Sequence, residues 1–262
     1  MEHYLDNAAT TKPCAEAAEA VVRCMTEQYG NPSSLHRKGL EAQHVMEHAR
    51  QQIAAALGCK AQELLFTSGA TESTNLALRG AVAAHGRKRK KIITSAVEHA
   101  SVRQTLAQLE QQGFTVVAVA PDADGRYHAE DFLREVDGNT CLVSMMLVNN
   151  ENGYRMPVEE TFRGVKRKDP EILTHCDAVQ GFLKVPFRTR SLNADLISLS
   201  GHKVHALKGA GALYLRQGVR IRPILFGGHQ EKSLRPGTES VPLIAAFGAA
   251  AEKLSQTCLL YT

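Results

Sequence analysis

Short apolar runs that alternate with amphipathic segments constrain the fold of this 262-residue chain more than any other feature. Seven runs have the length and composition of buried strands: residues 63–67, 91–94, 115–119, 141–148, 172–175, 196–199 and 212–215. Segments before, between and after them carry apolar residues at helical spacing: 13–29, 34–57, 71–84, 101–112, 130–136, 158–168 and 243–254. This alternation predicts an α/β fold in which helices cover both faces of a mostly parallel sheet.

Composition and charge exclude several classes of protein. The net charge is +4, with acidic and basic residues interspersed, so the chain lacks the electrostatic footprint of a nucleic-acid-binding protein. No apolar run approaches the length of a membrane span, and the polar beginning of the chain is unlike a signal peptide. The six cysteines are scattered without CxxC or zinc-ligand spacing, which indicates reduced thiols and no metal site. These features favour a cytoplasmic enzyme without nucleic-acid or membrane partners.

Polar residues follow the first predicted strand, at the position where open parallel sheets bind ligands. Ser68, Gly69, Ala70 and Thr71 come after residues 63–67 and open the next predicted helix. Free backbone N–H groups, a helix dipole and a threonine hydroxyl at such a turn can bind a phosphate group. A capping box with Ser68 or Thr71 as the cap explains the same residues equally well. Farther upstream, Ser34 is the expected N-cap of helix 34–57.

Three further strand ends carry side chains that suit an aromatic cofactor. His99 follows strand 91–94 and can stack on a ring, transfer protons or simply cap the next helix. Asn150 follows strand 141–148 and offers an amide to a carboxylate or a phenolic oxygen, or else forms a turn. Asp177 follows strand 172–175, with Gln180 one helical turn later on the same face. A carboxylate there can hold a protonated pyridine nitrogen or act as a helix N-cap.

A lysine follows the sixth strand. Residues 196–199 lead into Ser200, His202 and Lys203, and a glycine turn then precedes strand 212–215. A lysine just past a buried strand can face a cleft, and lysines with a depressed pKa form imines with aldehydes. Taken alone, Lys203 is better explained as a surface lysine in a loop. Together, however, the five strand ends contain every group that a site for pyridoxal 5′-phosphate (PLP) needs.

Eight short motifs extend this pattern over nearly the whole chain: residues 4–11 (YLDNAATT), 30–34 (GNPSS), 66–73 (FTSGATES), 98–99 (EH), 148–151 (VNNE), 175–180 (HCDAVQ), 200–203 (SGHK) and 235–238 (RPGT). In these motifs, in their order and in their spacing, the chain resembles cysteine desulfurases of the class V aminotransferase group, which are PLP enzymes of fold type I. The resemblance implies that Lys203 is the catalytic Schiff-base lysine. It also implies that Asp177 pairs with the pyridine nitrogen, Gln180 with the ring hydroxyl oxygen, and that His99 stacks on the ring.

The resemblance assigns the remaining site residues as well. Four of them would hold the phosphate: Ala70, Thr71, Ser200 and His202. Asn150 would contact the side of the site that binds the substrate carboxylate. Thr238 would reach the phosphate of a neighbouring subunit, so the resemblance implies a homodimer with shared active sites.

The implied reaction removes sulfur from L-cysteine to leave L-alanine and a persulfide, which passes to a sulfur-acceptor or scaffold protein of iron–sulfur cluster assembly or thiolation. The family's sulfur-accepting cysteine lies on a loop in the last third of its chain, followed by an arginine that binds the substrate carboxylate. This chain ends before either, and Cys176, its cysteine nearest the site, is typical of a strand core. We therefore expect one PLP-binding large domain over residues 1–262, with the small C-terminal domain absent. Residues 1–14 would form an arm that normally joins that domain, and persulfide formation would be lost or reduced.

Two alternatives remain open at this stage. One is another class V activity, such as an aminotransferase or a selenocysteine lyase. The other is an inactive truncated homologue. Alanine as product separates the first alternative from desulfuration, and an absorbance band that depends on Lys203 argues against the second.

Overall fold

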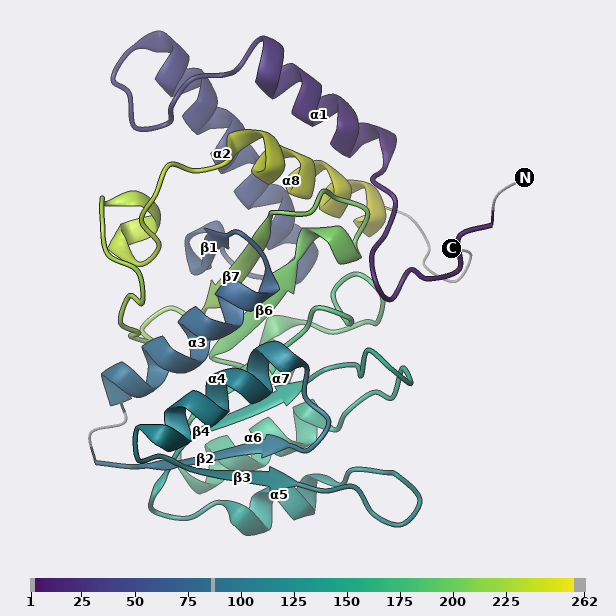
Figure 1. Ribbon diagram of the computed structural model, residues 1–262, viewed down its shortest axis with the longest axis vertical. Helices are drawn as coiled ribbons and strands as arrows, with labels where there is room; N and C mark the ends of the chain where they lie inside the picture. The colour runs from purple at the N-terminus through teal and green to yellow at the C-terminus, as the bar shows by residue number, and fades with distance from the viewer. Residues whose placement is uncertain (1–2, 86–87, 257–262) are drawn as a thin grey trace.

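A seven-stranded sheet forms the centre of the computed structural model, which describes residues 3–85 and 88–256 (Figure 1). The first two residues of the predicted arm and the last six of the chain lie outside this range. The strand order is β1-β7-β6-β5-β4-β2-β3. The strands are β1 (Leu64–Thr67), β2 (Lys91–Ser95), β3 (Thr115–Val119), β4 (Thr140–Met146), β5 (Leu173–Asp177), β6 (Leu196–Ser200) and β7 (Gly211–Leu215). β7 runs antiparallel to β1 and β6, whereas the other pairs are parallel.

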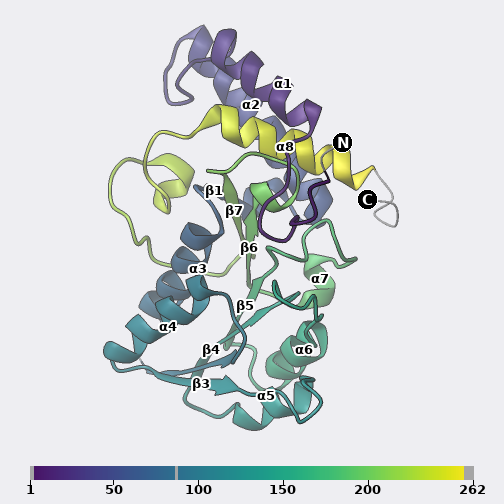
Figure 2. The same ribbon diagram turned by 45° about the vertical axis from the view of Figure 1, so that its right-hand side comes forward.

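Helices cover both faces of the sheet, as the continuous apolar character of its strands predicts. Their bounds are α1 (Ala15–Thr26), α2 (Arg37–Leu57), α3 (Ala70–His85), α4 (Ala100–Gln111), α5 (Ala129–Glu135), α6 (Val158–Lys168), α7 (Thr189–Leu192) and α8 (Val241–Ser255). Figure 2 shows α3 and α4 on one face and α5, α6 and α7 on the other, with α1, α2 and α8 packed together at the β1 end. One apolar core lies beneath α3 and α4, and a larger one contains Ile53, Phe162 and Phe247. None of the helices among the described residues is both long and apolar enough to cross a membrane.

Two local expectations are wrong. Ser34 does not cap α2, because its own N–H donates to the Asn31 carbonyl (2.9 Å) in a turn, and His36 is the N-cap. Asp177 does not begin a helical turn. It is the last residue of β5, where it pairs with Met146 of β4 and Ser198 of β6. Strand pairing on both sides therefore overrides the local tendency of aspartate to start a helix.

A turn that precedes Thr238 is tied to the sheet by a buried ion pair. In the 3-10 segment η3 (Gln230–Ser233), Glu231, Lys232 and Ser233 have φ of 43°, 60° and 60°, in the left-handed region. The Glu231 carboxylate accepts hydrogen bonds from Arg50 Nη2 (2.6 Å) and from the Phe66 N–H (2.8 Å). Arg50 and Glu231 have only 8% and 2% of their side-chain surfaces exposed. These bonds hold a backbone conformation that non-glycine residues otherwise avoid.

Candidate active site

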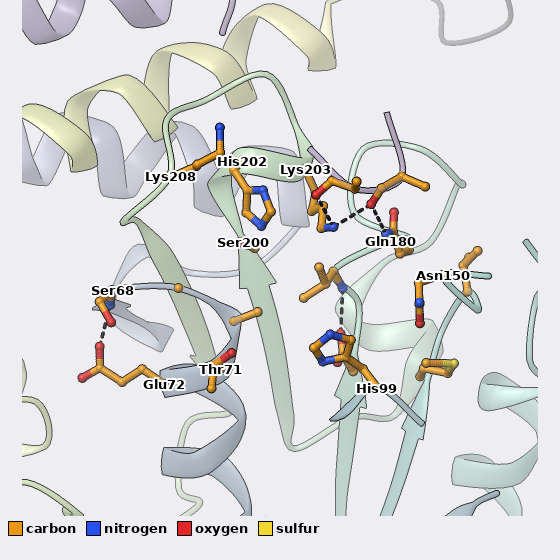
Figure 3. Close-up of a pocket in the computed structure, with 18 of the residues that line it drawn as sticks. Ser68, Thr71, Glu72, His99, Asn150, Gln180, Ser200, His202, Lys203 and Lys208 are labelled. Atoms are coloured by element: carbon orange, nitrogen blue, oxygen red, sulfur yellow. Dashed lines mark hydrogen bonds between the residues drawn. The ribbon is translucent and has the colours of Figure 1, made fainter. Parts of the chain in front are cut away.

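A cavity of about 610 Å³ lies at the carboxyl ends of the parallel strands, where the sequence predicts a site (Figure 3). It is lined by nine of the ten predicted site residues: Ala70, Thr71, His99, Asn150, Asp177, Gln180, Ser200, His202 and Lys203. The tenth, Thr238, is exposed and is not part of the lining of this cavity. The single chain therefore brings together every predicted residue except the one assigned to a neighbouring subunit.

The turn between β1 and α3 supplies backbone N–H groups to one end of the cavity. The Ser73 N–H donates to the Gly69 carbonyl (3.0 Å) and closes the first turn of α3. Helix geometry leaves the N–H groups of Ala70 and Thr71 without intrahelical acceptors, and the helix dipole adds positive potential there. The capping bond comes from Glu72, whose Oε2 accepts the Ser68 N–H (2.6 Å), and not from the Ser68 or Thr71 side chains that the sequence suggested. This turn can therefore bind an anion such as phosphate.

Gly211, the first residue of β7, lies against this turn. A Cβ at Gly211 would stand 2.6 Å from the Gly69 Cα and 2.8 Å from the Leu199 carbonyl oxygen. We expect Gly211→Ala to push the turn out of place and to lower the free energy of unfolding by about 1–3 kcal/mol, measured by denaturant titration. The control is Gly138→Ala, where a Cβ meets open space. Equal effects of the two changes would contradict close packing at Gly211.

Asp177 lines the cavity and is buried. Its Oδ1 accepts the Val179 N–H (3.0 Å). Burial raises the pKa of the Asp177 carboxyl, although the Val179 bond, His99 and Lys203 act in the opposite direction. Within residues 3–85 and 88–256, no basic side chain forms an ion pair with it. A protonated ring nitrogen is the kind of partner that this buried carboxylate lacks.

A row of buried hydrogen bonds fixes the strand that carries Asp177. His175 of β5 lies between the Ser144 hydroxyl of β4 (2.8 Å) and the Ser198 hydroxyl of β6 (2.9 Å). Burial lowers the pKa of His175 to about 3, so its ring stays neutral at physiological pH. His175 therefore supports the strand and does not contribute charge to the site.

Glu98 lies beside Asp177 in the core and was not assigned a role from the sequence. Its Oε1 accepts hydrogen bonds from the Ser95 hydroxyl (2.6 Å) and the Met146 N–H (2.9 Å). Its buried Oε2 has no hydrogen-bond partner in the described part of the chain. Burial raises the pKa of Glu98 to about 8, with a smaller contribution from the charge of Asp177. Glu98 is therefore a neutral carboxylic acid at pH 7. Because it carries no charge, it does not repel the Asp177 carboxylate.

His99 caps a helix, which is one of its predicted alternatives, and it also lines the cavity. It is the N-cap of α4, and its Nδ1 accepts the Ser101 N–H (3.1 Å). Because Nδ1 is an acceptor in this bond, the neutral ring carries its proton on Nε2. The cap thereby fixes both the position and the tautomer of the ring.

Lys203 extends from the short segment η2 (Gly201–Lys203) that follows β6. Its Nζ donates hydrogen bonds to the carbonyl oxygens of Ala8 (2.6 Å) and Ala9 (2.8 Å) (Figure 3). The Gln180 side chain donates to the same Ala8 oxygen (2.8 Å). Burial lowers the pKa of Lys203, although Asp6 and Asp177 oppose this. A depressed pKa makes the amine a better nucleophile at neutral pH.

Asp6, Ala8 and Ala9 of the N-terminal segment line the site, and the next two residues fasten this segment to residues 202–205. The Thr11 N–H donates to the His202 carbonyl (2.9 Å), and the Thr11 hydroxyl accepts the His205 N–H (2.7 Å). Thr10 is hydrogen-bonded through its hydroxyl to His202 Nδ1 (3.1 Å). Sequence reasoning did not find the roles of Ala8 and Ala9, because they act through backbone carbonyls that no side-chain pattern reveals.

Lys208 is a further lining residue that sequence reasoning missed as a site residue. Figure 3 shows it near His202, where it adds a basic side chain to the lining. Its position in the glycine turn after Lys203 was the available signal. Among the described residues, no group of three or more metal-ligating side chains is arranged to hold a metal ion. An amide turn, a buried carboxylate and a lysine around one cavity thus suit a phosphate-bearing aldehyde such as PLP.

Comparisons with known proteins identify the family. The model of the family Aminotransferase class-V matches residues 3–259, so the chain belongs to the class-V aminotransferases. It is similar to a cysteine desulfurase of Trichormus azollae and to the cysteine desulfurase IscS of Methanosarcina thermophila. Both are 45% identical to this chain over 249 residues, which cover 95% of it. These similarities confirm the predicted resemblance to cysteine desulfurases.

Solved structures agree with this assignment. A NifS-like protein superposes with a TM-score of 0.94 at 42% identity, over 97% of this chain and 70% of the other. A structure described as SspA in complex with cysteine gives a TM-score of 0.91 at 37% identity, over 96% of this chain and 72% of the other. The predicted fold class is therefore confirmed. The chain spans about 62% of the length of the curated relatives that it matches.

Proposed function

We propose that this chain binds PLP in the cavity and forms the cofactor-binding part of a cysteine desulfurase. The observation that carries the proposal is the position of Asp177, a buried carboxylate without a basic partner in the described residues, in the same cavity as Lys203 and the free N–H groups of α3. A buried carboxylate, an amine and an anion-binding turn are the three contacts that the pyridinium, aldehyde and phosphate of PLP require. The cavity volume also suits a small-molecule cofactor.

Each residue has a defined role in this proposal. Lys203 bonds the aldehyde, Asp177 holds the ring nitrogen, and Gln180 contacts the ring hydroxyl oxygen. His99 stacks on the ring with its Nε2–H directed by the helix cap. Four residues hold the phosphate: Ala70, Thr71, Ser200 and His202. Asn150 lies on the substrate side, and Thr238 contacts the phosphate of a partner subunit in a homodimer.

When bound, PLP supplies an electron sink for the carbanion at the substrate Cα. Lys203 moves the α-proton, and its lowered pKa suits an amine that must lose and regain a proton near neutral pH. Asp177 keeps the ring nitrogen protonated, because a carboxylate buried without another cation favours that proton. The arm at Ala8 and Ala9 positions the Lys203 amine through its two hydrogen bonds.

The described cysteines do not suit the persulfide step, which requires a thiolate. Burial raises the pKa of Cys59 to about 12 and of Cys141 to about 11. It raises the pKa of Cys176 well above its usual value, and desolvation also raises the pKa of Cys14 and Cys24. We therefore propose that none of these five thiols accepts the sulfur efficiently, and that persulfide formation by the described part of the chain is reduced or lost. L-Cysteine is the proposed substrate, with a sulfur-acceptor or scaffold protein of iron–sulfur assembly as partner, in the cytoplasm.

Titration of the 262-residue polypeptide with PLP tests cofactor binding. We expect a visible absorbance band from the lysine-bound cofactor and its loss in Lys203→Ala, because this change removes the amine that bonds the aldehyde. Lys88→Ala, which removes an exposed lysine outside the cavity, is the matched control and should keep the band. A wild-type chain without the band, or a Lys203→Ala variant that retains it, would refute the proposal.

Product analysis with L-cysteine tests the reaction. Alanine and sulfide indicate desulfuration, whereas transfer of the amino group to the cofactor indicates an aminotransferase. We expect alanine at a rate well below that of a cysteine desulfurase with its own sulfur-accepting cysteine. Full turnover by this polypeptide would contradict the predicted loss of the persulfide step.

A further inference from the structure

An ion pair joins the anion-binding turn to the segment that carries Thr238. Arg235 Nε donates to Glu72 Oε1 (2.9 Å), and Arg235 Nη2 donates to Glu72 Oε2 (3.3 Å). The side chains of Arg235 and Glu72 are only 21% and 13% exposed. The contact is thus a two-point, largely buried pair between residues 163 positions apart in the chain, and not a solvated surface pair.

Glu72 puts a negative charge at the end of the cavity that should bind phosphate. It lies in the first turn of α3, lines the cavity and accepts the Ser68 N–H beside the free amides of Ala70 and Thr71 (Figure 3). A carboxylate at a helix N-terminus stabilises the helix by itself. The Glu72 carboxylate also repels a phosphate dianion bound at the amides of Ala70 and Thr71. Because Glu72 is largely buried, solvent and salt screen this repulsion poorly.

We propose that Arg235 is a positioning residue for the phosphate end of the cavity. It neutralises Glu72 and fixes the carboxylate on Ser68, so that the amides of Ala70 and Thr71 remain available to an anion. This inference rests on the proposed function, because it assumes that the ligand carries a phosphate group. It also gives Arg235 a role within its own subunit, separate from the contact with a partner subunit proposed for Thr238.

The ionisation of Glu72 supports this role. Burial on its own raises the pKa of the Glu72 carboxyl, but Arg235 and the Ser68 N–H together hold that pKa below its usual value. Glu72 is therefore negatively charged at neutral pH. Without Arg235, the negative charge of the Glu72 carboxylate would have no basic partner at the cavity. Alternatively, the Glu72 side chain would move away and lose its hydrogen bond with the Ser68 N–H.

A purely structural link between α3 and the Thr238 segment makes a different prediction. If Arg235 only tied the two segments together, removing both partners would harm ligand binding at least as much as removing Arg235 alone. If Arg235 offsets a charge, removing Glu72 as well would restore binding. The double variant therefore separates the two roles.

The experiment measures the dissociation constants of PLP and of pyridoxal, which lacks the phosphate, for the wild-type chain, Arg235→Met, Glu72→Gln and the double variant. We expect Arg235→Met to weaken PLP binding by about tenfold or more, Glu72→Gln to bind PLP as well as wild type, and the double variant to come close to wild type. Pyridoxal affinity should change little in all four. Arg190→Met, at an exposed arginine of α7, is the control.

Several results would overturn the inference: unchanged PLP binding in Arg235→Met, a double variant as weak as Arg235→Met, or an equal loss of pyridoxal affinity. If Arg235→Met does not fold, Arg235→Lys replaces it. This variant keeps the charge and should retain most of the PLP affinity, while a loss as large as that of Lys203→Ala would refute the charge-offset role. Failure of the wild-type chain to form a Lys203-dependent band would instead refute the proposed function, so the two failures are distinguishable.

Discussion

Replacing Glu231 by alanine is expected to lower the free energy of unfolding by about 3–5 kcal/mol, because it removes the buried carboxylate that pairs with the buried Arg50 guanidinium. Arg50 donates to both carboxylate oxygens of Glu231, at 2.6 Å and 3.0 Å. The change also frees the Phe66 N–H of β1 and releases the left-handed turn at residues 231–233. Equilibrium denaturation in urea, monitored by circular dichroism, measures the effect.

A neighbouring glutamate offers a matched control for this change. Glu47 also pairs with Arg50 (3.2 Å), but its side chain is 46% exposed, so Glu47→Ala should cost at most about 1 kcal/mol. The double variant Arg50→Met/Glu231→Leu should recover much of the stability, because an apolar pair avoids the desolvation of two charges. A Glu231→Ala variant no less stable than Glu47→Ala would show that the ion pair does not hold the turn.

Replacing Glu98 by glutamine is expected to remove a large pH dependence of stability. The folded chain holds the Glu98 carboxyl with a pKa of about 8, whereas the unfolded chain has its ordinary value of 4.5. Between these values the folded state binds a proton that the unfolded state releases, so stability falls as pH rises from about 4.5 to about 8. The loss amounts to roughly 1.4 kcal/mol per pH unit, or about 4–5 kcal/mol as an upper bound.

Glutamine reproduces the protonated carboxyl but cannot ionise. Glu98→Gln should therefore match the wild type near pH 4.5 and exceed its stability by up to a few kcal/mol at pH 8. Denaturation curves at several pH values measure the free energy of unfolding of both proteins. In the difference between the two proteins, the contributions of other titrating groups such as His175 cancel. Glu110→Gln, at an exposed residue of α4, is the control and should follow the wild type. If the stability of Glu98→Gln and that of the wild type changed with pH in the same way, Glu98 would not be neutral and buried in the folded chain.

The positions of the strands and of most site residues could be predicted because both depend on local pattern. Residues 115–119 and 158–168 form the predicted strand and helix with the predicted bounds. The nine predicted residues that line the cavity also follow this rule, since the ends of neighbouring parallel strands meet at one edge of a sheet. Ser34 and the helical turn at Asp177 could not be predicted, because a local turn and strand pairing outweighed the intrinsic preference of each residue.

The sequence by itself determined the α/β alternation and the edge of the sheet at which the predicted site residues meet. These features follow from apolar periodicity and from which polar residues come after each strand. Only the tertiary structure decided that Ala8 and Ala9 hold the Lys203 amine, that Glu98 is buried beside Asp177, and that Arg235 faces Glu72. Those relations join residues far apart in the chain, or depend on burial. The charge of a buried group is set by its solvation and its neighbours in space, which no local pattern contains.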